Sequence, residues 1–315
     1  MEKLAIIGCG TMGHSIALSA ALAGLPVKLH GINFLETERA QRSIIDKLNV
    51  LSENGLLDSD NSELVKNRIS ITHSIPEVAE GASFIIETIP ENLEMKRDLF
   101  LYLDEICDVD VILASNTSGL SPSKIASGTL NPQRIVVTHF WNPAHLVPLV
   151  EVVRGIHTND QTIKRAFDLL KCMHKQPIEV KKESPGFVGN RLQFALLREA
   201  QYILEQGIAS KEDIDAAVTF GIGRRLSATG PLISADMGGL DVFSAISDYL
   251  FCELSNAKNA SPELKKMVEE NKFGVKTGEG YYKWDKSFIE KMNQKREKEL
   301  IHFFVQDSKV AKPTL

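Results

Sequence analysis

The sequence contains only four cysteines in 315 residues, at positions 9, 107, 172 and 252, and none forms a CxxC pair. Scattered cysteines in a chain of this length are typical of free thiols in a reducing compartment, and their spacing predicts no metal site. Basic residues are also not in excess, because 36 Lys and Arg stand against 41 Asp and Glu, a net charge of −5. We therefore expect no nucleic-acid partner.

Long apolar runs are missing as well. The first one, Leu4 to Ile7, stops at Gly8, which is too short for the apolar core of a signal peptide. No later run approaches the ~20 residues of a membrane-spanning helix. We expect a cytoplasmic protein with no membrane partner, long enough for one large domain and a smaller one.

Short apolar runs alternate with amphipathic stretches over the first 180 residues. Buried strands are predicted at 4–7, 27–29, 69–72, 84–87, 111–114, 135–138, 149–153 and 178–180. Helical patterns are predicted at 12–22, 36–54, 61–66, 95–106 and 160–174. This alternation predicts an α/β fold, a Rossmann-type doubly wound parallel sheet.

The pattern changes at residues 181–186, which read KKESPG. Only helices are predicted beyond them, at 190–206, 210–220, 242–254, 262–271 and 286–304, and residues 306–315 are expected to be disordered. The expected organisation is therefore one domain over residues 1–183 and a smaller all-α domain over residues 184–315.

A GxGxxG motif follows the first predicted strand and opens the first predicted helix. Gly8 permits the tight turn, Gly10 lets a pyrophosphate approach the backbone, and Gly13 lets helix and strand pack closely. Thr11 and Met12 complete the turn, where the first N–H groups of the helix face the phosphates. The motif predicts that residues 1–183 bind a dinucleotide.

One element of this dinucleotide-binding motif is absent. The second strand should end in Asp or Glu to bind the ribose 2′-OH, but Gly31 stands there. Its absence removes both a strong preference for NAD and a charge that would repel a 2′-phosphate. NAD is the expected cofactor, and NADP stays open because Gly31 replaces the acidic residue. Arg39 and Arg42, which lie nearby in the sequence, are more simply interpreted as solvated helix surface than as contacts to a 2′-phosphate.

Seven stretches together resemble the 3-hydroxyacyl-CoA dehydrogenase family. They occur in order over nearly the whole chain, which makes the set more specific than any member. The stretches are the glycine turn at 8–13, ETIPENL at 87–93, SNTS at 115–118, HFWNP at 139–143, LVEV at 149–152, SPGFVGNR at 184–191 and GVKTGEGYY at 274–282.

The resemblance implies roles for matching residues. His139 matches the catalytic histidine, Glu151 its carboxylate partner, Ser118 a substrate-contacting serine, and Asn190 an asparagine from the second domain. It also implies that the helical domain contacts substrate and makes a homodimer.

Further residues match the cofactor site of this family. Glu91 and Lys96 match residues on the nicotinamide side, and Asn116 lies in the matching SNTS stretch. The same resemblance makes a short-chain 3-hydroxyacyl-CoA the leading substrate, exchanged with its 3-oxoacyl-CoA. No metal ion is expected.

The chemistry of an alcohol dehydrogenase agrees with these residue types. A base must take the hydroxyl proton while hydride leaves the same carbon, and the histidine pKa near neutrality suits this role. A carboxylate on the other ring nitrogen would fix the tautomer and stabilise the imidazolium. His145 is the nearest competitor of His139 and is expected at a loop surface.

Two alternatives stay open. Related dehydrogenases act on free hydroxy acids such as gulonate or carnitine, and this chain has Lys47 as the only basic residue between Ser43 and Leu57, where the family contacts CoA. Arg224 and Arg225 could meet a carboxylate, although surface salt bridges are the simpler interpretation. The other alternative is a dinucleotide-binding protein without catalysis.

Overall fold

A computed structural model describes residues 2–310 and divides the chain into two compact units. Unit 1 comprises Met1–Val188 and Arg296–Leu315, and unit 2 comprises Gly189–Lys295. The expected boundary, after residue 183, lies before this division, and the expected second domain included residues from Arg296 on that here pack with unit 1. The expected disorder is wrong for residues 306–310, which are helical; residues 311–315 lie outside the described residues.

Eight strands form the single sheet of unit 1, in the order β3-β2-β1-β4-β5-β6-β7-β8. The strand order reverses between β1 and β4, and ligands of such sheets bind at this switch point, beyond the carboxyl ends of the strands. The Rossmann-type fold is therefore confirmed. The strands are β1 (Leu4–Ile7), β2 (Val27–His30), β3 (Ile69–Thr72), β4 (Phe84–Glu87), β5 (Ile112–Ser115), β6 (Ile135–Phe140), β7 (Leu149–Val153) and β8 (Gln176–Val180).

One strand pair departs from the predicted parallel sheet. Strand β7 runs antiparallel to β6, whereas the other paired strands are parallel. The connection, residues 141–148, is too short for the crossover that a parallel pair needs. The antiparallel register sets His139 directly opposite Glu151.

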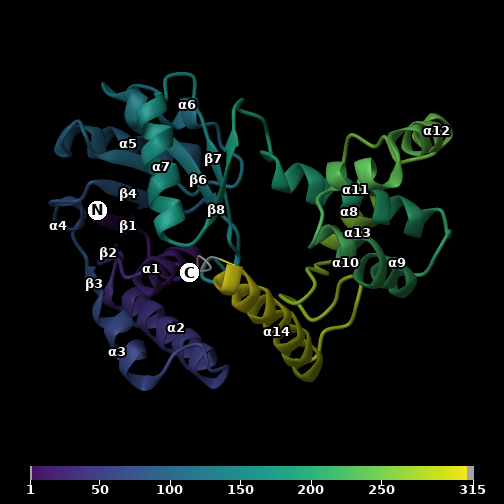
Figure 1. The fold of residues 1–315 in the computed structure, drawn as a ribbon, viewed down its shortest axis with the longest axis horizontal. Helices are drawn as coiled ribbons and strands as arrows, with labels where there is room; N and C mark the ends of the chain where they lie inside the picture. Colours follow the sequence, from purple (N-terminus) through teal and green to yellow (C-terminus); the bar gives the residue numbers. More distant parts are fainter. Residues whose placement is uncertain (1, 311–315) are drawn as a thin grey trace. The chain divides into compact units, whose positions relative to one another are not determined.

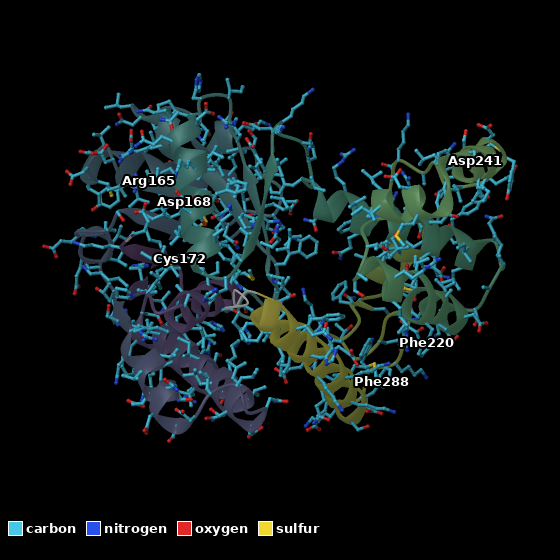
Figure 2. All side chains as sticks on the ribbon, in the orientation of Figure 1. Arg165, Asp168, Cys172, Phe220, Asp241 and Phe288 are labelled. Carbon is cyan, nitrogen blue, oxygen red and sulfur yellow. The ribbon has the colours of Figure 1, made fainter. Side chains whose placement is uncertain are left out.

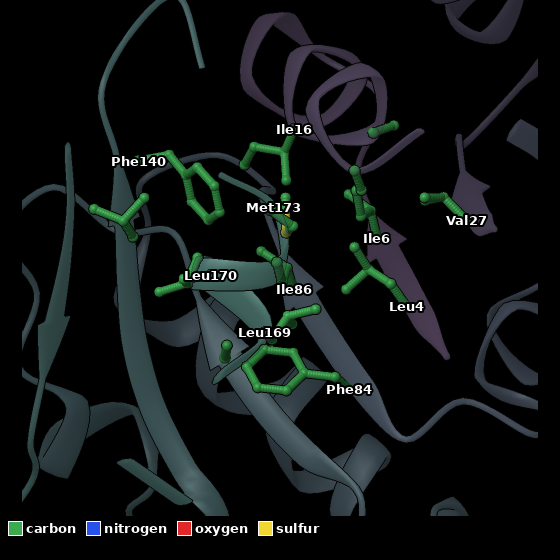
Figure 3. Packing of buried hydrophobic residues seen from close by; sticks show 14 of the residues in the cluster. Leu4, Ile6, Ile16, Val27, Phe84, Ile86, Phe140, Leu169, Leu170 and Met173 are labelled. Atoms are coloured by element: carbon green, nitrogen blue, oxygen red, sulfur yellow. The ribbon is translucent and has the colours of Figure 1, made fainter. Parts of the chain in front are cut away.

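Helices cover both faces of the sheet (Figure 1). Successive side chains of a strand point to opposite faces, so Leu4 and Ile6 join one core and Ala5 and Ile7 the other. Figure 3 shows the first core, where Ile16 and Leu170 pack over the sheet. The helices of unit 1 are α1 (Thr11–Leu22), α2 (Phe34–Glu53), α3 (Ser59–Asn67), α4 (Ile75–Ala79), α5 (Leu93–Ile106), α6 (Pro122–Ile125), η1 (Pro132–Arg134) and α7 (Asp160–Cys172).

Unit 2 is helical, and no residue between 189 and 295 is buried. Large apolar side chains such as that of Phe220 are exposed (Figure 2). Its elements are α8 (Gly189–Glu205), α9 (Lys211–Ala217), η2 (Val218–Ile222), α10 (Gly223–Leu226), α11 (Pro231–Gly238), α12 (Leu240–Leu250), α13 (Pro262–Glu269) and the beginning of α14 (Lys286–Val310).

The later part of α14 belongs to unit 1. Ile301 is buried there in a small cluster with Leu51 of α2 and Leu146 of the 141–148 loop. The last described helix of the chain thus completes a small hydrophobic cluster of unit 1, separate from the two cores on the faces of the sheet.

Candidate active site

The glycine turn after β1 has the geometry that a pyrophosphate needs. Gly8 has a φ of +102°, a conformation that favours glycine, and a Cβ on Gly13 would come within 1.8 Å of the Gly8 carbonyl oxygen. A Cβ on Gly10 would meet no atom within 4 Å, so the space over this residue is open. These residues therefore fit a dinucleotide phosphate.

Helix α1 begins at this turn without a capping side chain. Its N-cap is Gly10, whereas Asn33 and Asn92 cap α2 and α5 through their side chains. An uncapped N-terminus leaves backbone N–H groups and the positive end of the helix dipole for an anion. Thr11, Met12 and Gly13 supply the first turn of this helix.

Gly31 is enclosed by neighbouring side chains. A Cβ at this position would lie 2.4 Å from Cγ2 of Thr37 and 2.7 Å from Sγ of Cys9. Both neighbours are short and buried, so they cannot swing aside as the end of a long side chain would. The residue expected to be acidic is therefore a glycine in a space already filled.

A buried ion pair lies at the carboxyl end of β4. The Lys96 ammonium is 2.5 Å from Oε1 of Glu87 and also donates to the Ile89 carbonyl. Glu87 accepts a second hydrogen bond from the Ser115 hydroxyl at 2.6 Å. Burial raises the pKa of the Glu87 carboxyl, while the Lys96 and Ser115 contacts lower it. Lys96 is held inside unit 1.

Glu91 connects this pair to the segment that follows β5. Its Oε2 atom is 3.6 Å from the Lys96 ammonium, and its Oε1 atom accepts from the Thr117 hydroxyl and the Ser118 backbone N–H at 2.5 and 3.1 Å. Asn116 accepts from the backbone N–H of Phe140 at 2.8 Å. The structure therefore brings Glu91, Lys96 and Ser118 together at the carboxyl ends of β4 and β5.

His139 and Glu151 form a dyad across the antiparallel strands. His139 Nδ1 lies 2.8 Å from Glu151 Oε2, and Glu151 is fully buried. An ionised carboxylate only accepts hydrogen bonds, so the imidazole Nδ1–H donates and Nε2 is the ring atom left for proton transfer. This arrangement can accept a proton at one ring nitrogen while the carboxylate stabilises the resulting imidazolium.

Two further donors contact Glu151. Trp141 donates its indole N–H to Oε2 at 3.3 Å, and the backbone N–H of Val188 donates to Oε1 at 2.8 Å. The rings of Trp141 and Phe187 both lie 5.7 Å from the His139 ring, centroid to centroid. Neither aromatic residue was singled out by the sequence analysis, although both lie in stretches that it quoted.

The two remaining catalytic candidates occupy different units. Ser118 is exposed just after β5 in unit 1, whereas Asn190 is the second residue of α8 in unit 2. Arg224 and Arg225 lie in α10, also in unit 2.

His145 was expected at a loop surface, but it is buried beside α1. Its Nδ1 atom lies 3.0 Å from the Ser15 hydroxyl. Burial, with Lys47, Lys175 and His14 nearby, lowers its pKa to about 3. His145 is therefore neutral at physiological pH and unsuited to be the proton-transferring residue.

Metal and membrane features are absent from the described part of the chain. Between residues 2 and 310 no three His, Cys, Asp or Glu side chains come together as a metal site would require. Over the same residues, no helix combines the length and the apolar character needed to cross a membrane.

Comparison with known families matches nearly the whole chain. Residues 3–184 match the NAD-binding domain of 3-hydroxyacyl-CoA dehydrogenase, and residues 186–284 match the C-terminal domain of the same enzyme. These two matches meet close to the place where unit 1 gives way to unit 2.

Two curated relatives resemble the chain over most of its length. The 5-formyl-3-hydroxy-2-methylpyridine 4-carboxylate 5-dehydrogenase of Mesorhizobium japonicum is 35% identical and is matched over 96% of both chains. The 3-hydroxybutyryl-CoA dehydrogenase of Clostridioides difficile is 38% identical over 90% of this chain and 100% of its own.

A solved structure supports the same relationship. The crystal structure of a 5-formyl-3-hydroxy-2-methylpyridine 4-carboxylic acid 5-dehydrogenase, described as an NAD+-dependent dismutase, superposes with a TM-score of 0.87. It is 33% identical and is matched over 98% of this chain and 99% of its own. Family matches over both units and relatives above 30% identity lead to one conclusion: the chain is an oxidoreductase with a nicotinamide-cofactor domain and belongs to the 3-hydroxyacyl-CoA dehydrogenase family.

Proposed function

We propose that this protein is a dehydrogenase that interconverts a hydroxyl carbon and a ketone, with His139 and Glu151 as its acid/base dyad. The observation that carries the proposal is the 2.8 Å contact between the imidazole and a fully buried carboxylate. A merely structural histidine has no need of a buried carboxylate on one nitrogen and a second nitrogen left for proton transfer.

The dyad acts on the hydroxyl proton. In oxidation, Nε2 of His139 accepts the proton, and Glu151 stabilises the imidazolium through Nδ1–H. In reduction, the imidazolium returns the proton to the ketone oxygen. The nicotinamide ring, when bound, accepts or delivers the hydride at the same carbon. Ser118 and Asn190 are proposed donors to the substrate oxygen, where charge develops.

The proposed cofactor site comprises the glycine turn and the polar segments after β4 and β5. Gly8, Gly10 and Gly13, with Thr11 and Met12 at the N-terminus of α1, would hold the pyrophosphate. The remaining proposed contacts are Glu91, Lys96 and Asn116. The Lys96 ammonium donates hydrogen bonds to the Glu87 carboxylate and the Ile89 carbonyl. We therefore propose that it acts by holding Glu91 and the 88–91 segment in place.

The first candidate substrate is a short-chain 3-hydroxyacyl-CoA. Membership of the family and the resemblance to a 3-hydroxybutyryl-CoA dehydrogenase support it. The matched C-terminal domain ends at residue 284, so α14, over Lys286–Val310, is not required for that resemblance.

The second candidate is a free hydroxy acid, and a specific observation favours it. The relative named for a pyridine carboxylate is matched over 96% of both chains, against 90% of this chain for the acyl-CoA relative. A small aromatic or aliphatic hydroxy acid, gulonate or carnitine included, would need no binding surface for CoA.

We also propose that the protein is a homodimer formed through unit 2. This unit buries none of its residues, and exposed large apolar side chains lie along its helices. Apolar surface of this extent marks an interaction surface in a soluble protein. A second copy of the chain is the simplest partner, because most oligomers are symmetric.

The deciding experiment measures reduction of acetoacetyl-CoA with NADH and with NADPH, in parallel with a panel of free hydroxy and keto acids. Wild-type protein is compared with His139→Gln and with His157→Gln, an exposed histidine of the same unit that serves as the matched control. His139→Gln should lower turnover by about 100-fold or more, the usual share of acid/base catalysis. Its cofactor affinity, measured by calorimetry, should stay unchanged.

Each outcome has a defined meaning. Turnover of acetoacetyl-CoA selects the first candidate, and turnover of free acids alone selects the second. Full activity of His139→Gln would contradict the dyad. Cofactor binding without turnover of any compound would support a non-catalytic dinucleotide-binding protein instead.

A further inference from the structure

Trp141 contacts both members of the proposed dyad. It lies one residue after β6 and is half-buried. Its indole N–H donates to Glu151 Oε2 at 3.3 Å, the oxygen that accepts from His139 Nδ1 at 2.8 Å. Its ring is tilted by 52° to the imidazole ring.

Two donors on one carboxylate oxygen share its negative charge. Each N–H stabilises the anion, so each reduces the attraction that remains for the other donor. The Val188 N–H holds the opposite oxygen, so donors on both oxygens resist rotation of the carboxylate. A phenylalanine at position 141 would retain most of the ring and lose the donor.

The groups around the imidazole come from several elements. Glu151 is the ionisable partner from β7, Trp141 and Phe187 contribute uncharged rings, and the Val188 backbone is uncharged. Farther along the sheet on either side, Glu87 on β4 is paired with Lys96 and Glu179 on β8 with Arg154. The indole N–H is therefore the contact that can be removed without changing any formal charge.

We propose that Trp141 is a positioning residue of the dyad, whose indole N–H fixes the Glu151 oxygen that faces His139 and takes up part of its charge. This inference rests on the proposed His139–Glu151 function and deepens it. Trp141 acts through Glu151 and needs no contact with substrate.

The test uses Trp141→Phe and the pH dependence of turnover, with the substrate that the acetoacetyl-CoA and hydroxy-acid experiment selects. Without the indole N–H, Glu151 attracts the imidazolium more strongly, so the ring keeps its proton to higher pH. Oxidation requires the neutral ring, and the midpoint of its acid limb should rise by about 0.5 to 1 pH unit, the worth of one weak hydrogen bond to a charged group. Turnover below the midpoint should fall about threefold to tenfold and recover at high pH.

The chain offers a matched control, because its second tryptophan, Trp284, lies in unit 2. Trp284→Phe should leave the pH profile unchanged. This variant also leaves Trp141 as the only tryptophan, so its emission reports on the dyad without turnover. Protonated imidazole quenches indole fluorescence, and the emission should titrate with the same midpoint as the rate.

Two results would overturn the role of Trp141. One is a Trp141→Phe profile that keeps the wild-type midpoint, whether turnover is intact or uniformly lower. The other is Trp141 emission in Trp284→Phe that does not change across the rate midpoint, a measurement that holds even if Trp141→Phe fails to fold. Glu151→Gln separates the two proposals, since full activity of that variant would refute the dyad itself.

Discussion

The two units differ in how much apolar surface their own packing covers. Unit 1 buries whole strands, such as β1 and β4, between helices on both sheet faces. Unit 2 is also rich in leucine and phenylalanine, yet none of its residues is buried. Apolar burial is the main favourable term in folding. Unit 1 therefore covers its own apolar strands, whereas unit 2 leaves its large apolar side chains exposed, as the proposed dimer surface would require.

The two units also differ in which proposed functional residues they contain. His139, Glu151, Trp141 and the glycine turn all lie in the unit that is well packed. Preorganised catalytic groups depend on rigid surroundings. The unit with exposed apolar helices contributes Asn190 and the proposed dimer surface. Three experiments test this difference between the two units.

The largest effect is expected from charges on an exposed apolar helix of unit 2. Leu232 and Met237, both on α11, are 82% and 76% exposed. Replacing both with lysine should weaken self-association by about 100-fold, or roughly 3 kcal/mol, because an interface would then bury unpaired charge. Sedimentation velocity over a concentration series measures this.

Leu130→Lys is the matched control, since Leu130 is 89% exposed in unit 1. It should leave association unchanged. A wild-type chain that stays monomeric at high concentration would contradict the dimer and remove the proposed reason for the exposed surface.

A smaller effect is expected at Gly31 in unit 1. Asp at this position must displace Cys9 and Thr37, and overpacking of this kind typically costs about 1–3 kcal/mol. The carboxylate should also shift the ratio of NAD to NADP affinity toward NAD. Chemical denaturation and calorimetric binding of both cofactors measure the two effects. An unchanged affinity ratio would mean that residue 31 does not face the ribose.

The last prediction concerns the acid stability of unit 1, where the effect is small near neutral pH and grows toward low pH. The pKa of His145 is lowered from 6.5 to about 3, so the unfolded chain binds more protons between these values. The free energy of unfolding should therefore be fully retained above about pH 6.5 and fall as the pH drops toward 3, by up to ~1.4 kcal/mol per pH unit. Denaturation at a series of pH values should show a shallower fall for His145→Asn.

The exposed His157 again provides the control, because His157→Gln should keep the wild-type slope. An unchanged slope in His145→Asn would show that the burial of His145 does not govern acid stability. Burial inside unit 1 would then not explain how this unit responds to acid.

Local patterns in the sequence predicted most of unit 1. The glycine turn predicted the β1–α1 junction because only glycine fits a φ of +102° and a close helix–strand contact. Apolar runs predicted the strands because parallel strands are buried on both faces. The antiparallel β6–β7 pair was not predicted, although the connection over residues 141–148 is too short for the crossover between parallel strands.

Contacts between distant segments were beyond the sequence patterns. The burial of His145 depends on Ser15, 130 residues away, so no local pattern could reveal it. The filled space at Gly31 depends on the Cys9 and Thr37 side chains. The indole contact of Trp141 depends on the strand register that sets Glu151 opposite His139.

The return of α14 has a consequence for how the chain is made. Ile301 completes a cluster with Leu51, about 250 residues earlier, so the first unit cannot finish folding until the end of the chain has left the ribosome. Until then the cluster of Leu51 and Leu146 lacks the apolar side chains that α14 contributes. A premature stop codon shortly before Ile301 would therefore damage the half of the protein that is synthesised first.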